Sequence, residues 1–255
     1  MDDVEVRILE KPKLRDTILI EGLPGIGLVG KLAADHMLDE LKAKKFAELY
    51  SPYLPPQVSI RDDGTIHLVN NELYYWKGKE NDLILLLGDF QGITPDGQYR
   101  ISEKTLEIGE KFNLSKIFTL GGLGTGNIVR TPKVFGAATD KNLVKELKKY
   151  EVIFKGGGAI FGAAGLLIGL GMQRNIPGAC LMGETHGQII DAKSAEAVLR
   201  VLTKVLRIEI DMTELTEKAK ETEEQMSRVS KMISEQKKAV ERQQEFLNET
   251  PTYIR

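Results

Sequence analysis

Glycine is confined to one part of this chain, and its distribution constrains the architecture more than any single motif does. All 25 glycines lie between Gly22 and Gly187 of the 255 residues. From Gln188 to Thr250 there is neither glycine nor proline, the two residues that most often interrupt a helix. The sequence therefore predicts a turn-rich domain over residues 1–210, a long helix over residues 211–250 and a flexible tail over residues 251–255.

Within the glycine-containing part, short apolar runs alternate with helical patterns. We expect strands over residues 17–23, 46–50, 83–90, 116–120, 152–154 and 179–182. We expect helices over residues 26–41, 102–112 with Ser102 as the cap, from Asp140 onward, and 191–206 with Asp191 as the cap. A turn at residues 62–64 and a hairpin over 66–76, turning at Asn70 and Asn71, add antiparallel pairs. This alternation predicts an α/β fold, a three-layer α/β/α sandwich with a largely parallel mixed sheet.

Composition excludes several classes of protein. The formal net charge is -2, so no overall field favours nucleic acid or an anionic membrane. The acidic start of the chain is unlike a signal peptide, and the single cysteine, Cys180, fits a cytoplasmic protein without disulfides. The uncharged run over residues 156–173 is rich in glycine and closely flanked by Lys155 and Arg174, which favours a buried helix or strand-turn-helix over a membrane span.

The glycines after the first expected strand nearly complete two nucleotide-binding motifs. Gly25, Gly27 and Gly30 have the spacing of the dinucleotide-binding turn. The same stretch, ending in Lys31, has the spacing of a phosphate loop, but Leu32 stands where Ser or Thr would bind magnesium. The motif lies between a strand and a helix, the context that both kinds of site require.

Three interpretations of this loop remain open. Dinucleotide binding needs an acidic ribose partner, for which Glu48 is at a suitable distance in the sequence. A phosphate loop would need a further acidic metal ligand, for which Asp89 is the best candidate. In the favoured interpretation, the glycines permit a tight turn and close helix–strand packing. A small anion remains a candidate ligand where strand-end loops meet, at the backbone N–H groups of Gly25, Gly27, Gly30, Gly121, Gly122 and Gly124.

No arrangement of reactive residues points to catalysis or to a metal. His36, His67 and His186 share no ligand spacing, so we expect no metal site and no cofactor. Cys180, His186 and Asp191 could form a nucleophile triad, but Cys180 lies in an apolar strand and is better explained as a buried, inert thiol.

The glycine-free part carries a heptad pattern. Apolar residues recur at alternating spacings of four and three, which is typical of a helix that packs on another helix. We expect an oligomerisation or partner helix formed by Leu215, Ala219, Met226, Val229, Ile233, Val240 and Leu247. Thr222, Gln236 and Gln243 interrupt the seam, which argues against a very tight coiled coil.

Five motifs in order resemble the proteasome assembly chaperone family, the group related to the second eukaryotic assembly chaperone subunit. The motifs are Glu21–Gly30, Pro55–Gln57, Gly88–Gln91, Gly121–Gly126 and Gly183–Gly187, and the resemblance covers roughly residues 5–210. The version found here is similar to the archaeal members, some of which have extended C-terminal helices.

The resemblance implies a sandwich with the topology of purine nucleoside phosphorylases but without their catalytic residues. It also implies a cytoplasmic protein that forms homo-oligomers and binds proteasome α subunits or a second member of its family. Some members insert a C-terminal hydrophobic-tyrosine-any tail between ring subunits. Here the chain ends in Tyr253, Ile254 and Arg255, with Ile254 where that tail has tyrosine, so the motif is shifted.

Two functional hypotheses follow. The first is a non-enzymatic chaperone or scaffold for complex assembly, which needs neither nucleic acid nor membrane. The alternative is an enzyme or sensor that binds a nucleotide or phosphate through its glycine loops.

Overall fold

The computed structural model describes residues 3–222, and its main sheet has eight strands in the order β1-β3-β6-β7-β2-β8-β10-β9. The strands are β1 Glu5–Ile8, β2 Thr17–Glu21, β3 Lys44–Tyr50, β6 Asn71–Trp76, β7 Leu83–Gly88, β8 Leu114–Gly124, β9 Val134–Ala138 and β10 Gly178–Thr185. A separate two-stranded hairpin contains β4 Val58–Ile60 and β5 Ile66–Leu68. Strands β7, β2, β8 and β10 are mutually parallel, whereas the pairs toward both edges are antiparallel.

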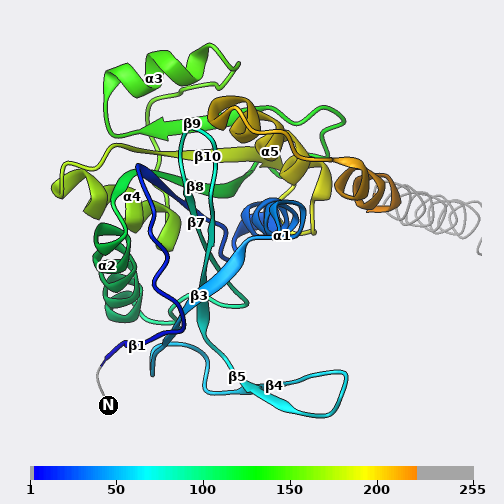
Figure 1. Ribbon diagram of the computed structural model, residues 1–255. Coiled ribbons are helices and arrows are strands. Elements are labelled where there is room, and N and C mark those ends of the chain that lie inside the picture. The colour runs from blue at the N-terminus through cyan, green and yellow to red at the C-terminus, as the bar shows by residue number, and fades with distance from the viewer. Residues whose placement is uncertain (1–2, 223–255) are drawn as a thin grey trace, which may run out of the picture.

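Helices cover both faces of this sheet, which confirms the expected α/β/α sandwich (Figure 1). They are α1 Val29–Leu41, α2 Pro95–Lys111, α3 Lys141–Lys148, α4 Ala163–Gln173 and α5 Ala192–Leu206; the short 3-10 turn η1 Ile26–Leu28 precedes α1. One apolar cluster joins α1, α3 and α5 to the sheet, and a second joins α2 and α4 to the opposite face. Because β2 is buried at every position, it forms the centre of both clusters.

The expected hairpin over residues 66–76 is wrong. Strand β5 pairs instead with β4, and the two strands are joined by the expected turn at residues 62–64. Strand β6 lies between β3 and β7 in the main sheet. Asn70 and Asn71 are buried where the chain passes from the small hairpin to the main sheet. The Asn71 side chain donates a hydrogen bond to the Phe90 carbonyl at 2.9 Å. A tertiary contact therefore holds a segment whose composition favours an exposed turn.

The predicted start of α2 is also wrong. The helix begins at Pro95, and the Thr94 hydroxyl accepts a hydrogen bond from the Gly97 N–H at 3.1 Å. Ser102, the expected cap, is buried in the middle of the helix. A capping threonine, proline at the first helical position and Asp96 in the first turn form a complete start signal, which the glycine at position 97 obscured.

The other boundaries differ less. Asp140 and Asp191 cap α3 and α5 as expected. The expected helix from residue 26 starts with η1, because Gly27 and Leu28 both have positive φ, and α1 proper begins at Val29. Residues 152–154 make a single bridge, Ile153 to Phe135, instead of a strand. Edge strands β1 and β9 were not expected; both are short, and β1 is mostly exposed.

Residues 213–222 are helical, and the expected continuation of this helix lies outside the described residues. Over residues 3–222, no helix combines the length and apolar character that crossing a bilayer requires.

The caps of α2 give a stability prediction. Thr94→Ala should lower the free energy of unfolding by about 1 kcal/mol, because the Gly97 N–H loses its acceptor. Ser102→Ala should be neutral or slightly stabilising, because the buried Ser102 hydroxyl has no hydrogen-bond partner within the described residues. Urea denaturation of both variants measures the difference. A larger loss for Ser102→Ala than for Thr94→Ala would contradict the observed helix start.

Candidate functional site

The carboxyl ends of the parallel strands bring the glycine loops together at one edge of the sheet. Strand β2 leads into the loop that contains Gly25, Gly27 and Gly30. Strand β8 ends with Gly121, Gly122 and Gly124, and β10, its parallel neighbour, ends at Thr185. We call this region the carboxyl edge; it comprises the loops that follow β2, β7, β8 and β10 together with residues 161–162 before α4.

Backbone atoms approach each other closely at this edge. A Cβ at Gly30 would lie 2.1 Å from the Leu120 carbonyl oxygen, and one at Gly122 would lie 2.4 Å from the Ile26 carbonyl oxygen. A Cβ at Gly22 would lie 2.1 Å from the Ala34 Cβ. Real Cβ atoms do not come so close, so glycine at these positions lets the first turn of α1 pack directly on β8. These distances support the close-packing interpretation of the motif.

An apolar side chain of the loop lies beside glycines of the neighbouring loops. The Ile26 Cγ2 lies 3.6 Å from the Cβ position of Gly124 and 3.5 Å from that of Gly187. The Gly27 carbonyl accepts a hydrogen bond from the Asp191 N–H at 2.9 Å. An aliphatic side chain and carbonyl oxygens are poor neighbours for an anion, because they neither donate hydrogen bonds nor carry positive charge. The anion site at these glycines stays a prediction that this geometry disfavours.

Gln91 is a residue of the edge that the sequence-based candidates omitted. Its Nε2 donates to the Pro24 carbonyl at 2.7 Å, and its Oε1 accepts from the Ala163 N–H at 3.0 Å. Oε1 also accepts from Gln98 Nε2 at 3.2 Å. One amide therefore ties the loop after β2 to the starts of α2 and α4. Gln91 ends the Gly88–Gln91 motif just after the buried strand β7, and these were the sequence signals at this position.

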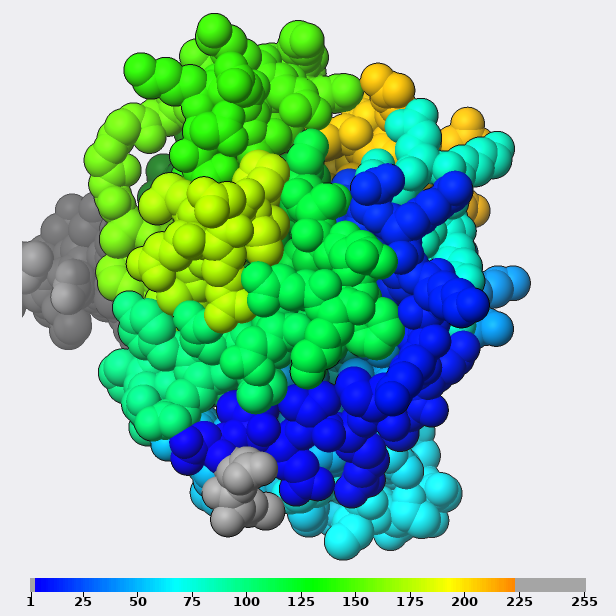
Figure 2. Space-filling view, turned by 60° about the vertical axis from the view of Figure 1, so that its left-hand side comes forward, coloured from blue at the N-terminus to red at the C-terminus, as the bar shows by residue number. Residues whose placement is uncertain are grey.

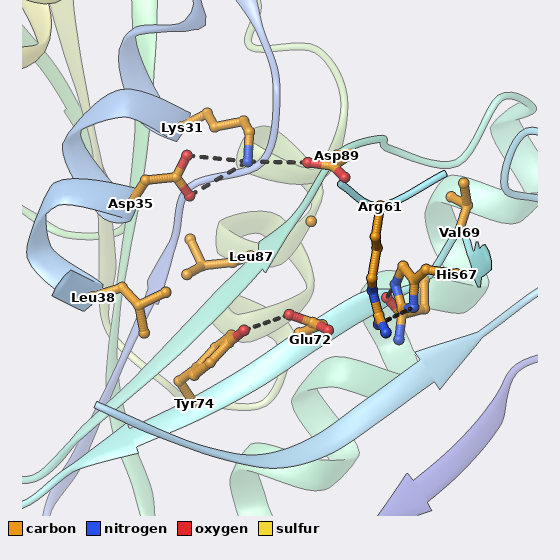
Figure 3. Close-up of a pocket in the computed structure, with 12 residues that line it drawn as sticks. Lys31, Asp35, Leu38, Arg61, His67, Val69, Glu72, Tyr74, Leu87 and Asp89 are labelled. Atoms are coloured by element: carbon orange, nitrogen blue, oxygen red, sulfur yellow. Dashed lines mark hydrogen bonds and ion pairs between the residues drawn. The ribbon is translucent and has the colours of Figure 1, made fainter. Parts of the chain in front are cut away.

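Lys31, the lysine of the nominal phosphate loop, forms ion pairs with two aspartates. Its Nζ lies 3.1 Å from a carboxylate oxygen of Asp35 and 3.3 Å from one of Asp89 (Figure 3). Asp89 was the candidate for a second metal ligand. Burial is the largest influence on the pKa of Asp35 and raises it above its ordinary value, although Lys31 opposes this shift. Two carboxylates face this one lysine, so the local charge is unfavourable for a phosphate group.

This ion pair borders a polar pocket of about 270 Å³ between α1, β6 and β7. Tyr74 donates a short hydrogen bond to Glu72, and the pKa of Tyr74 is raised above its ordinary value, first by burial and then by this bond. His67 contacts Arg61 at 3.3 Å and Asn70 at 3.2 Å. Figure 3 shows these polar groups turned toward one another.

The candidate ribose partner is far from the loop in the topology. Glu48 lies on β3, and strands β6 and β7 separate β3 from β2. Its carboxylate accepts hydrogen bonds from Lys45 at 3.2 Å and Tyr50 at 3.0 Å. A dinucleotide fold needs the acidic residue on the strand beside the glycine loop. The arrangement seen here does not provide it.

Glu21, at the end of β2, is a buried carboxyl group. Burial raises its pKa from 4.5 to about 8, and backbone hydrogen bonds to Leu23 and Leu120 offset part of that shift. The Leu23 N–H donates to Glu21 Oε1 at 2.9 Å, which shapes the turn out of β2. The raised pKa favours the protonated form of Glu21 in the folded protein at neutral pH.

The remaining reactive residues do not assemble into a centre. Cys180 is buried, and desolvation raises the pKa of its thiol to about 12. The His36 ring nitrogen Nε2 lies 2.6 Å from the Asp211 carbonyl oxygen, so this ring is engaged by the backbone. Within residues 3–222, no group of three or more metal-ligating side chains is present.

The carboxyl edge instead exposes apolar side chains. Each loop after a parallel strand presents an exposed isoleucine: Ile26 after β2, Ile93 after β7, Ile128 after β8 and Ile190 after β10. Phe161, just before α4, is 86% exposed. Apolar side chains that gather at one edge of a soluble fold commonly mark a surface that contacts another protein.

The first residues of the heptad seam face their own domain. Leu215 is 1% exposed and Ala219 is 5% exposed, and both belong to the apolar cluster that contains α1 and α5. Thr216 donates a hydrogen bond to Glu196 of α5 at 3.0 Å. Met226, Val229, Ile233, Val240 and Leu247, and the tail residues Tyr253, Ile254 and Arg255, lie outside the described residues.

The glycine motif gives a paired prediction. Gly30→Ala should cost about 3 kcal/mol in unfolding free energy, because its Cβ meets the rigid Leu120 carbonyl. Gly25→Ala should change stability by less than about 0.5 kcal/mol, because no described residue other than its chain neighbours has an atom within 4 Å of the Gly25 Cβ position. Chemical denaturation of the two variants is the measurement. Equal effects would show that close packing does not explain the motif.

Glu21 gives a prediction about pH. Since its pKa is raised from 4.5 to about 8, the unfolded chain ionises across this range while the folded protein stays protonated, so stability is lost as pH rises. Glu21→Gln does not titrate, and its melting temperature relative to wild type should therefore rise between pH 5 and pH 8.

The matched control is Glu107→Gln. The difference between its melting temperature and that of wild type should stay constant between pH 5 and pH 8. The hydrogen bond from Lys104 lowers the pKa of the Glu107 carboxyl. Glu107 is therefore largely ionised in both the folded and the unfolded state over this pH range. A flat difference for Glu21→Gln would contradict the assignment of a protonated Glu21.

Comparison with known proteins confirms the resemblance that the motifs indicated. The chain is similar to the solved structure of Pyrococcus furiosus PbaB, an archaeal proteasome activator, with a TM-score of 0.85, 46% identity, and coverage of 90% of this chain and 100% of that one. It is also similar to Pyrococcus furiosus PbaA, an archaeal homolog of proteasome-assembly chaperone, with a TM-score of 0.75, 29% identity, and coverage of 98% and 99%.

A curated relative from Methanocaldococcus jannaschii, an uncharacterised protein, is 43% identical over 229 residues, which cover 89% of this chain and 88% of the relative. A sequence model of the PAC2 family matches residues 19–230, which include the carboxyl edge and the start of the last helix. The chain therefore belongs to the PAC2 family.

Proposed function

We propose that this chain is a non-enzymatic, protein-binding homo-oligomer that serves as a chaperone or scaffold for the archaeal proteasome in the cytoplasm. The observation that carries the proposal is its likeness to the Pyrococcus proteasome activator along the full length of that chain, at 46% identity. The likeness to the homolog of proteasome-assembly chaperone adds to it. The partners would be other copies of the chain, and proteasome α subunits or a second member of the family.

The carboxyl edge is the surface that we assign to protein contacts. Its exposed isoleucines and Phe161 lie on loops, while the sheet and Gln91 beneath them are rigidly hydrogen-bonded. A rigid frame with exposed apolar side chains loses little conformational entropy when it binds a protein. The heptad residues from Met226 onward and the tail at 253–255 are a second contact surface in this proposal.

The mass of the intact assembly tests self-association. Light scattering should give a multiple of the 28.4 kDa chain mass, and the double change Phe161→Ser with Ile128→Ser should lower it, because both side chains lose apolar contact area. Met172→Ser is the matched control: this residue is also exposed, but it lies near the far end of α4, so the mass should not change.

Binding to proteasome α subunits tests the function itself. The full chain should form a complex with archaeal α subunits that is visible by intact-complex mass measurement. Removal of residues 251–255 should weaken this complex if the tail docks. A monomer that forms no complex with α subunits would overturn the proposal.

A further inference from the structure

A groove lies on the surface between α2 and the N-terminal segment, at the opposite side of the sheet from α1 and α5. Its volume is about 880 Å³, and it is lined by β1, residues 11–14 and the second half of α2. Figure 2 shows the N-terminal segment, in blue, bordering α2, in green, on this face. The carboxyl edge contributes no residue to the lining.

The floor of the groove is apolar. Val4, Leu14 and Ile108 are buried, and Val6, Ile8 and Phe112 are partly exposed around them. Side chains alternate along β1, so Val4, Val6 and Ile8 share the face that meets α2, while Arg7 turns to the other face and lies over the Tyr50 ring. Ile8 is 39% exposed, so the floor can still bury apolar area against a partner.

The rim is basic although the chain as a whole has a net charge of -2. Lys11, Lys13, Lys104 and Lys111 line the groove, against the single carboxylate of Glu5. Lys104 pairs with Glu107 at 2.7 Å. In the part of the chain that the structure describes, no ion pair joins Lys11, Lys13 or Lys111 to a carboxylate. Lys11 and Lys13 therefore border the apolar floor without an ion-pair partner among the described residues, and Lys111 interacts with Glu107 only through longer-range charge attraction.

One wall of the groove is an open sheet edge. β1 is the last strand of the eight-stranded order and pairs with β3 on one side only, within residues 3–222. In the described part of the chain, the backbone N–H and C=O groups on its other side have no strand partner, and such an edge accepts an additional extended segment.

Hydrogen bonds hold both ends of the groove in place. Near α2's last turn, Asn113 Nδ2 donates to the Leu14 carbonyl at 2.7 Å and the Thr17 hydroxyl donates to the Phe112 carbonyl at 2.6 Å. At the other end, the Ser51 hydroxyl donates to the Asp3 carbonyl at 2.8 Å, and Arg100 pairs with Asp3. The groove is therefore formed before any partner arrives.

We propose that this groove binds an extended, acidic segment of a partner protein, which adds to β1 as a further strand. Alternate apolar side chains of the segment would contact Val6 and Ile8, and its carboxylates would meet Lys11, Lys13 and Lys111. The rim lysines lie after β1 and on α2, not on the edge strand itself, so they leave its open side accessible. The preformed apolar floor beside them gives a segment a surface on which to dock.

Fluorescence anisotropy tests the proposal with a defined probe, a labelled peptide of about seven residues in which Glu alternates with Val and Leu. The triple variant Lys11→Glu, Lys13→Glu and Lys111→Glu should bind at least about tenfold more weakly than wild type, since each reversed rim charge removes up to about 1 kcal/mol. The control reverses three exposed lysines on the α3 side, Lys145→Glu, Lys148→Glu and Lys149→Glu, and should bind within about twofold of wild type.

A second probe examines strand addition in the unmodified protein, so it does not depend on how the variants fold. The same peptide with alternate backbone nitrogens methylated cannot complete the ladder and should lose about tenfold in affinity. No binding of the first peptide to wild type, equal binding by the triple variant, or equal binding of the methylated peptide would each overturn the proposal.

Discussion

The contact between the Gly30 backbone and the carbonyl of Leu120 determines how the rest of the molecule is arranged. It places the first turn of α1 directly on the central strand β8, with no side chain between them. α5 then packs beside α1, and Leu215 and Ala219 complete the same cluster. On the opposite face, Gln91 joins the loop after β2 to the starts of α2 and α4. Two layers of helices thus meet the loop after β2, one through a backbone contact and the other through a side-chain amide.

The same packing explains why a nucleotide-like motif lacks the other parts of a nucleotide site. A phosphate loop surrounds its ligand with N–H groups and directs a lysine toward it. Here the Ile26 side chain lies beside Gly124 and Gly187, Lys31 pairs with Asp35 and Asp89, and Glu48 lies beyond two intervening strands. The glycine spacing serves close approach, and the exposed isoleucines above it give the edge an apolar surface suited to protein contacts.

Sequence patterns succeeded where one local signal dominated. β2 and β7 are almost continuous apolar runs, and such runs specify buried central strands whatever surrounds them. Asp140 and Asp191 cap their helices because a carboxylate at that position satisfies free N–H groups locally. Prediction failed where a distant residue decided the outcome. Asn71 is held by the Phe90 carbonyl, and Gly97 sits inside α2 because a Cβ there would strike Tyr53.

The sequence by itself determined the α/β class, the family and the residues of the glycine loops, because hydrophobic periodicity and glycine spacing are local properties of the chain. Only the tertiary structure decided what the loops do. The role of the loop after β2 depends on Leu120, Gln91 and Asp89, which lie far from it in sequence and reach it through the parallel order of β7, β2 and β8. The groove beside β1 likewise exists only because α2 and the N-terminal segment meet in space, since each of them supplies only part of the groove's lining.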